Sequence, residues 1–318
     1  MKARVLAVGA VAALLTACSG GSGTQPVPVV SGPNTQSTAR SELSVLSTFT
    51  ARDNATGTLV RIFPTRDVID AFGRSAQRHR SSSNLTYNGG PVQTAPQLYV
   101  VFWGSAWSGS GDPDGVQTRL KSFYAAVGGG RWLNSVTQYT QTGGAHVGNA
   151  GNIFAGSYVD TTSSPPSTPS QSQMAAEAAK AAAHFGNYTA SASYVVAMPH
   201  GIKPSGFGTQ YCAYHSSTVA AGGTIAWTNL PYMPDAGFAC GVGSVNNPGT
   251  LDGVTVVGGH EQGETETDPR PNSGWLDSSG AENGDKCAWM SLENNPNAGG
   301  FPTQPLWSNA TSSCVQSY

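Results

Sequence analysis

The sequence predicts an α/β or α+β fold: a single mixed-sheet domain with a central metal-site helix and two disulfides. Three observations support this prediction. Short apolar segments alternate with helical segments after residue 90, an order typical of a sheet covered by helices. One glycine-rich helical segment near residue 260 carries several metal-competent side chains, and four cysteines lie in the last third of the chain.

The expected strands are short apolar runs rich in β-branched and aromatic residues. The clearest is Gln97–Trp103, with the sequence QLYVVFW. Further strands are expected at residues 136–139, 153–159, 193–198 and 225–230.

Two helices are expected between these strands. Val116–Val127 has apolar residues at helical spacing and stops at three consecutive glycines. Gln171–Phe185 is rich in alanine, and Gly186 follows its end, where a left-handed cap is common.

The N-terminus has the features of a secretory signal. Lys2 and Arg4 precede an apolar stretch that is too short to span a bilayer. The stretch ends in small residues and Cys18, which resembles a bacterial lipobox. The resemblance implies removal of residues 1–17, diacylation of Cys18 and attachment to a membrane. Ser19 then implies the outer membrane in a Gram-negative cell; an ordinary signal peptide that happens to contain a cysteine is the alternative.

The rest of the chain divides by composition. Residues 18–40 are rich in Gly, Ser, Thr and Pro and predict a flexible tether. Residues 41–90 have only a weak pattern and are interpreted as a pro-segment or linker region. Residues 91–318 are expected to form the domain. The formal net charge is −2, and the chain has no basic cluster, so nucleic acid is not expected as a partner.

The four remaining cysteines suggest two disulfides, because their number is even and the expected compartment is oxidising. The favoured pairs are Cys212–Cys240 and Cys287–Cys314, which close the smaller loops. A four-thiolate zinc site is the alternative, but no CxxC spacing supports it.

The most informative segment is expected to form a helix that ends before Pro269, because a residue before proline disfavours the α conformation. At about 100° per residue, with His260 at zero, Glu264 lies near 40°, Asp268 near 80° and Glu261 near 100°. These metal-competent side chains therefore share one quadrant of the helix.

Such crowding is unfavourable without a cation, since carboxylates four residues apart repel each other. The spacing is a variant of the His-Glu-x-x-His motif, with Glu264 in place of the second histidine. In this interpretation His260 and Glu264 bind zinc and Glu261 is the general base. A solvated polar face is the alternative. Gly258, Gly259 and Gly263 favour a buried helix, since glycine costs about 1 kcal/mol in an exposed one.

The third protein ligand is expected to be Asp285 or Asp268. Asp277 and Glu282 share a turn-rich loop with Asp285, and these acids could instead bind calcium or serve only as turn residues. Among the other histidines, His200 and His215 are candidates to line the site.

Several motifs resemble a group of secreted bacterial proteins with a His-Glu-x-x-Glu…Thr-Asp-Pro centre, regarded as metallopeptidase-like. They are GGHEQGETETDP at 258–269, GWLDSSGAENGDKC at 274–287 and TIAWTNLPYMP at 224–234. A fainter similarity, including GPV at 90–92 and VVFWG at 100–104, is to the plant phosphate-induced Exordium proteins, in which the His-Glu pair is lost.

The functional expectation is a zinc-dependent hydrolase, most simply an endopeptidase acting on protein or peptide outside the cytoplasm. The alternative is a non-catalytic, Exordium-like envelope binding module, stabilised by calcium.

Overall fold

The computed structural model describes residues 43–76 and 83–318. Side chains are described for residues 43–71 and 83–318. The expected signal peptide, the lipidated Cys18 and the tether lie outside the described residues. The described residues form one compact unit. In the part of the chain that the structure describes, no helix combines the length and apolar character needed to cross a membrane.

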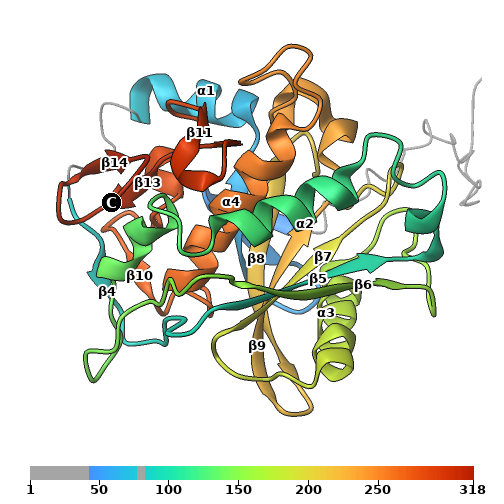
Figure 1. Cartoon of the computed structure of the whole chain (residues 1–318), viewed down its shortest axis with the longest axis horizontal. Coiled ribbons are helices and arrows are strands. Elements are labelled where there is room, and N and C mark those ends of the chain that lie inside the picture. Colours follow the sequence, from blue (N-terminus) through green and yellow to red (C-terminus); the bar gives the residue numbers. More distant parts are fainter. Residues whose placement is uncertain (1–42, 77–82) are drawn as a thin grey trace, which may run out of the picture. The chain divides into compact units, whose positions relative to one another are not determined.

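An eight-stranded sheet runs through this unit (Figure 1), in the order β1-β2-β3-β8-β9-β7-β5-β6. The strands β5, β6, β7 and β9 are parallel neighbours, whereas β1, β2, β3 and β8 join through antiparallel pairs that end on β9. In chain order the strands are β1 (Leu43–Ser47), β2 (Thr50–Asp53), β3 (Leu59–Pro64), β5 (Gln97–Trp103), β6 (Phe154–Asp160), β7 (Ala192–Ala197), β8 (Tyr211–Ala220) and β9 (Gly223–Leu230).

Helices cover both faces of the sheet. α2 (Val116–Val127) and α4 (Asp252–Thr267) lie together on one face, and α3 (Gln171–Phe185) lies on the other (Figure 1). α1 (Arg66–Ala76) follows β3. The remaining elements are short: the strand pairs β4 (Thr86–Tyr87) with β10 (Trp275–Leu276), β11 (Glu293–Asn295) with β12 (Phe301–Thr303) and β13 (Leu306–Ser308) with β14 (Ser313–Val315), and the 3₁₀ helices η1 (Ser105–Ser108), η2 (Leu133–Gln138), η3 (Met233–Cys240), η4 (Asp285–Cys287) and η5 (Pro296–Ala298).

The mixed α/β architecture and both disulfides are confirmed. Cys212 pairs with Cys240, and Cys287 pairs with Cys314. The predicted end of α3 is also found: Gly186 has φ 69°, in the left-handed region.

Two predictions about local structure are wrong. The expected strand at 136–139 lies largely in η2, where Ser135 and Thr137 hydroxyls donate to the backbone carbonyls of Trp132 and Asn134. Such local bonds give the chain an alternative to a strand. The expected linker at 41–90 instead contributes β1, β2 and β3 to the large sheet. Strand β3 is buried from Val60 onward, and a segment buried on both faces lacks the alternation that would have revealed it.

A carboxylate pair on the α3 side of the sheet predicts a pH-dependent stability. Burial, and then the neighbouring carboxylate of Asp160, raise the pKa of Glu177 from 4.5 to about 7. Lys180 forms an ion pair with Asp160. An acid whose folded pKa is raised favours folding while it stays protonated. Its contribution is therefore complete below about pH 4.5 and is lost as pH rises to about 7.

We expect Glu177→Gln to weaken this dependence of stability on pH. The free energy of unfolding of the variant, relative to that of the wild type, should be roughly 1–3 kcal/mol higher at pH 8 than at pH 4.5. Urea unfolding at both pH values measures the effect. Glu293→Gln, at an exposed position, is the control. Parallel pH profiles for the wild type and Glu177→Gln would contradict the prediction.

Candidate metal centre

Helix α4 is buried along its whole length, including its polar residues. Its glycines permit this packing. A Cβ on Gly259 would lie 2.9 Å from Trp132 and 3.0 Å from Phe123, and one on Gly258 would lie 2.8 Å from the Tyr124 hydroxyl. The helix therefore approaches its neighbours as closely as the glycines predicted, although aromatic side chains, rather than another backbone, make these contacts.

The first polar group surrounds His260, which is 0% exposed. Its Nε2 lies 3.1 Å from Glu264 Oε1 and 3.8 Å from Asp285 Oδ1. The imidazole stacks on Phe63 of β3, with ring centroids 3.8 Å apart. Burial lowers the pKa of His260 to about 4, against the attraction of Asp285, so the ring is neutral at pH 7, the form that binds a metal.

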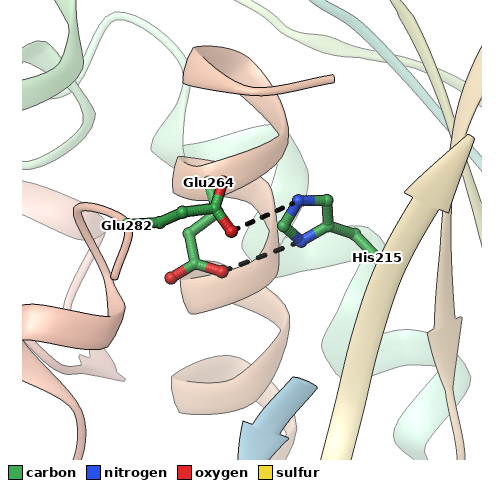
Figure 2. Close-up of side chains that lie close together, drawn as sticks. All are labelled: His215, Glu264 and Glu282. Carbon is green, nitrogen blue, oxygen red and sulfur yellow. Dashed lines mark ion pairs between the residues drawn. The ribbon is translucent and has the colours of Figure 1, made fainter. Parts of the chain in front are cut away.

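The second group surrounds His215 on β8, which is also 0% exposed. Figure 2 shows this imidazole facing two glutamates on one side of its ring, one from α4 and one from the loop before η4. Its Nδ1 lies 3.7 Å from Glu264 Oε2, and its Nε2 lies 3.6 Å from Glu282 Oε2. Glu264 therefore contributes one carboxylate oxygen to each group.

Each group brings ligand-type atoms within 4.8 Å of one another, so that each could hold a metal ion. Several of these atoms are buried without a hydrogen-bond partner: Nε2 of His260, Oδ1 of Asp285, Nε2 of His215 and both carboxylate oxygens of Glu282. Nε2 of His260 and Oε1 of Glu264 are close but make no hydrogen bond. Unpaired buried polar atoms that point at one another are costly, and a cation between them would satisfy them.

The predicted general base, Glu261, stands beside both groups. Its Oε2 lies 3.1 Å from Nδ1 of His215, and its Oε1 is buried without a partner. Burial, followed by the charges of Glu264 and Asp285, raises the pKa of Glu261 well above its ordinary value. Burial raises the pKa of Glu264 to about 8 and that of Asp285 well above normal. A bound cation would oppose these shifts by favouring the ionised carboxylates.

Arg61 supplies a positive charge from β3, although it is only 2% exposed. Its guanidinium donates to Thr50 Oγ1 at 2.9 Å, to Gly280 O at 2.5 Å and to Asn272 Oδ1 at 2.7 Å. Its Nε lies 3.6 Å from Glu282. This arginine lies in the weakly patterned segment 41–90, where no local pattern indicates a role in the site.

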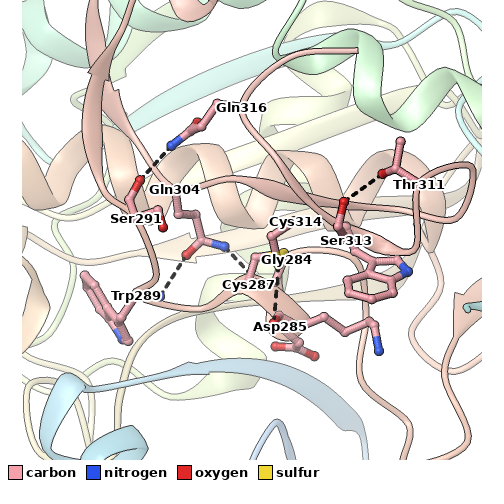
Figure 3. The surroundings of a disulfide bond; sticks show 12 residues. Gly284, Asp285, Cys287, Trp289, Ser291, Gln304, Thr311, Ser313, Cys314 and Gln316 are labelled. Atoms are coloured by element: carbon pink, nitrogen blue, oxygen red, sulfur yellow. Dashed lines mark hydrogen bonds between the residues drawn. A yellow bond between two sulfur atoms is a disulfide. The ribbon is translucent and has the colours of Figure 1, made fainter. Parts of the chain in front are cut away.

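The loop that carries Glu282 and Asp285 is tied to α4 and to the C-terminal region. The Asp285 amide donates to Glu264 Oε1 at 2.8 Å, and the Asn283 side chain donates to Gly263 O at 2.9 Å. Figure 3 shows the disulfide Cys287–Cys314 beside this loop. The covalent bond and the hydrogen bonds together hold both acids against the helix.

Gln304 completes the surroundings of His260. Its amide nitrogen donates to Gly284 O at 2.8 Å (Figure 3). The same nitrogen lies 3.1 Å from Nδ1 of His260. Metal ligation by Nε2 places the imidazole proton on Nδ1, where it needs an acceptor. Loading of this site therefore requires the Gln304 amide to turn its oxygen toward the ring. Gln304 could not be predicted from the sequence, because a lone glutamine in a short strand-like segment belongs to no recognisable pattern.

Gly284 offers a test of how tightly the loop fits. A Cβ at this position would lie 2.7 Å from His260 Nδ1 and 2.9 Å from Glu264 Oε1. We expect Gly284→Ala to displace these side chains and to weaken metal binding by roughly 10- to 100-fold, the usual effect of disturbing a ligand's support. Isothermal titration with zinc measures it. Gly109→Ala, whose Cβ would meet its nearest neighbour at 3.9 Å, is the control; equal affinities would contradict the expectation.

Other candidate residues belong to neither group. Both oxygens of Asp268 accept backbone amides of the following loop, from Asn272 at 2.7 Å and from Gly274 at 2.7 Å. Asp277 binds Lys286 at 3.1 Å and Ser279. His200, with its side chain 52% exposed, pairs with Asp235.

The predicted residues His260, Glu264 and Asp285 thus lie together in the first group. His215 and Glu282 form the second group with Glu264, which the two groups share. Comparisons with protein-family models, with curated proteins and with solved structures found no match for this chain.

Proposed function

We propose that this protein is a metal-dependent hydrolase. One observation carries the proposal: Glu261 keeps a buried carboxylate oxygen unpaired beside convergent histidine and carboxylate ligands. A metal that only stabilised the fold would need its ligands but not this additional acid, whose desolvation is costly. A general base needs such an acid, with its pKa raised toward the working pH.

The metal in this proposal is held by His260, Glu264 and Asp285. A site with one imidazole and two carboxylates suits zinc, which accepts nitrogen and oxygen ligands. Calcium, the other cofactor considered, prefers six to eight oxygen ligands, and the buried imidazole makes it the less suitable ion. Asp268 is not needed as a ligand, because its oxygens are engaged by backbone amides.

The metal, when bound, supplies a Lewis acid that polarises a carbonyl group and water. The chain supplies the proton transfers. Glu261 accepts the proton of the attacking water and later returns it to the leaving group. His215, 3.1 Å away, holds the other oxygen of Glu261 and so orients the base. Phe63 stacks on His260 and restrains the rotation of that ligand.

The test is the Glu261→Gln variant of the purified chain. We expect it to retain zinc, counted by mass spectrometry, and to hydrolyse a fluorogenic peptide library at least 100-fold more slowly than the wild type, the lower range for loss of a general base. Glu266→Gln is the matched control, because Glu266 is a buried acid of the same helix that bonds to Gln262 rather than to the two groups. Equal activity in wild type and Glu261→Gln, or a folded wild type that binds no metal, would overturn the proposal.

A second candidate function rests on the burial of the site. His260, Glu264 and Asp285 are at most 1% exposed, and closed metal sites are typical of structural ions. In that case the chain is a metal-stabilised, non-catalytic envelope binding module. It would bind and be stabilised by the metal, and the wild type would hydrolyse no peptide in the same assay.

The cellular setting is part of the proposal. Two disulfides support an oxidising compartment, and a lipid on Cys18 would anchor the domain to a membrane outside the cytoplasm. The substrate would then be an envelope or external protein or peptide.

A further inference from the structure

We propose that the centre holds two metal ions, with a second cation bound by His215, Glu264 and Glu282. This inference deepens the proposed function and rests on it for the first metal position. The second position takes a divalent transition ion of the same class, since it also offers one imidazole and two carboxylates. Glu264 would then bridge the two ions.

The placement of Glu264 is the first argument. Its Oε1 lies 3.1 Å from Nε2 of His260, whereas its Oε2 lies 3.7 Å from His215. The nearer nitrogen of His215 to Oε2 is Nδ1, and the ring edge that carries both nitrogens faces Glu264 and Glu282. The two oxygens of one carboxylate therefore lie beside different imidazoles. A bridging carboxylate has this arrangement, and two-metal hydrolytic sites hold their ions roughly 3.5–4 Å apart.

The second argument is the orientation of His215. Nδ1 lies 3.1 Å from Glu261 Oε2, so an N–H on Nδ1 donates to that carboxylate and leaves the lone pair on Nε2. Nε2 faces Glu282 (Figure 2) and has no hydrogen-bond partner. An imidazole that donates one N–H to a carboxylate and offers its other nitrogen is the usual arrangement of a metal-ligating histidine.

The third argument is what a single ion would leave behind. With one metal between His260 and Asp285, Nε2 of His215 and both oxygens of Glu282 would stay buried and unpaired. An unsatisfied buried group costs about 1–3 kcal/mol, and a charged one costs more. Arg61 offsets part of the charge of Glu282, from 3.6 Å, but forms no hydrogen bond with it. A second cation between Nε2 of His215 and Oε2 of Glu282 would satisfy these two atoms together.

The experiment counts metal in the full chain. The protein is equilibrated with Zn²⁺, freed of excess ion by desalting, and analysed by mass spectrometry. We expect two zinc ions per wild-type chain, one in Glu282→Gln, one in Asp285→Asn and none in Glu264→Gln. One ion in the wild type that is lost in Asp285→Asn but kept in Glu282→Gln would overturn the second position and leave the proposed function standing. No ion in the folded wild type would overturn both.

A measurement on the wild type alone covers the case in which a variant fails to fold. The chain is loaded with Mn²⁺ and studied by electron paramagnetic resonance. Two ions bridged by Glu264 are expected to give an exchange-coupled multiline spectrum at two equivalents. Two equivalents that give only the six-line spectrum of isolated Mn²⁺ would overturn the inference, because the ions would then occupy unrelated sites.

Discussion

Removal of bound metal is expected to lower the melting temperature of this protein by about 8–16 °C. A ligand present at 1,000 times its dissociation constant stabilises the folded state by about 4 kcal/mol, and each kcal/mol corresponds to roughly 2–4 °C in a domain of this size class. The physical reason is the set of buried ligand atoms that have no partner unless a cation lies between them. Without a cation, Glu264 and Asp285 face His260 with several ligand atoms unpaired.

Calorimetric scans of the zinc-loaded chain, with and without EDTA, measure this effect. The matched control is Glu264→Gln, which is expected to bind no zinc and should melt at the same temperature in both solutions. If EDTA leaves the wild-type melting temperature unchanged although the chelator has removed the metal, the centre does not stabilise the fold.

Loss of Arg61 is expected to be the most destabilising substitution of a charged residue outside the ligand set. Arg61→Ala should reduce the free energy of unfolding by about 3–5 kcal/mol, the usual result of breaking a buried ion pair from one side. The guanidinium is 2% exposed, and its three hydrogen bonds tie β3 to β2 and to the loops at Asn272 and Gly280. Its removal also leaves Glu282 without the nearby positive charge.

Arg52→Ala is the control for this prediction. Arg52 is an exposed arginine of the adjacent β2 that donates to Gly57 O, and its loss should change stability by no more than about 0.5 kcal/mol. Guanidinium-chloride unfolding of both variants gives the comparison. Arg61→Lys should be intermediate, because lysine keeps the charge and loses the planar set of donors. Equal stability of Arg61→Ala and Arg52→Ala would contradict this account of the centre.

The parallel part of the fold was accessible from the sequence. Strand β5 and helices α2 and α3 lie at the predicted residues, because each is either a continuous buried run or an amphipathic segment with a clear end. The antiparallel part was not accessible. The ten-residue strand β8 leads directly into the turn before its antiparallel partner β9. Its small, polar and aromatic residues follow neither the alternation of a half-buried strand nor the spacing of a helix.

The candidate site shows the same division. Local spacing predicted that His260 and Glu264 act together, because residues four apart on a helix are neighbours. The same rule failed for Asp268, which is the C-cap of α4 with φ −144° and ψ 66°. Because the backbone of Asp268 is no longer helical, its side chain does not lie at the angle that helical spacing predicts. It accepts hydrogen bonds from backbone amides of the following loop. The choice among Asp277, Glu282 and Asp285 depended on long-range packing, which single-sequence patterns do not contain.

The wide separation of the ligands along the chain has a consequence for folding kinetics. His215, His260 and Asp285 come from a strand, an α-helix and a 3₁₀ helix. Within each proposed site, only His260 and Glu264 of the first are close in sequence. An unfolded chain therefore offers a metal little more than that one local pair. If the ligands assemble only after the transition state for folding, added zinc should slow unfolding in proportion to its occupancy and leave the refolding rate nearly unchanged. The ion would then stabilise the completed fold without assisting its formation. The lifetime of the native protein, rather than the rate at which it folds, would depend on the concentration of available metal.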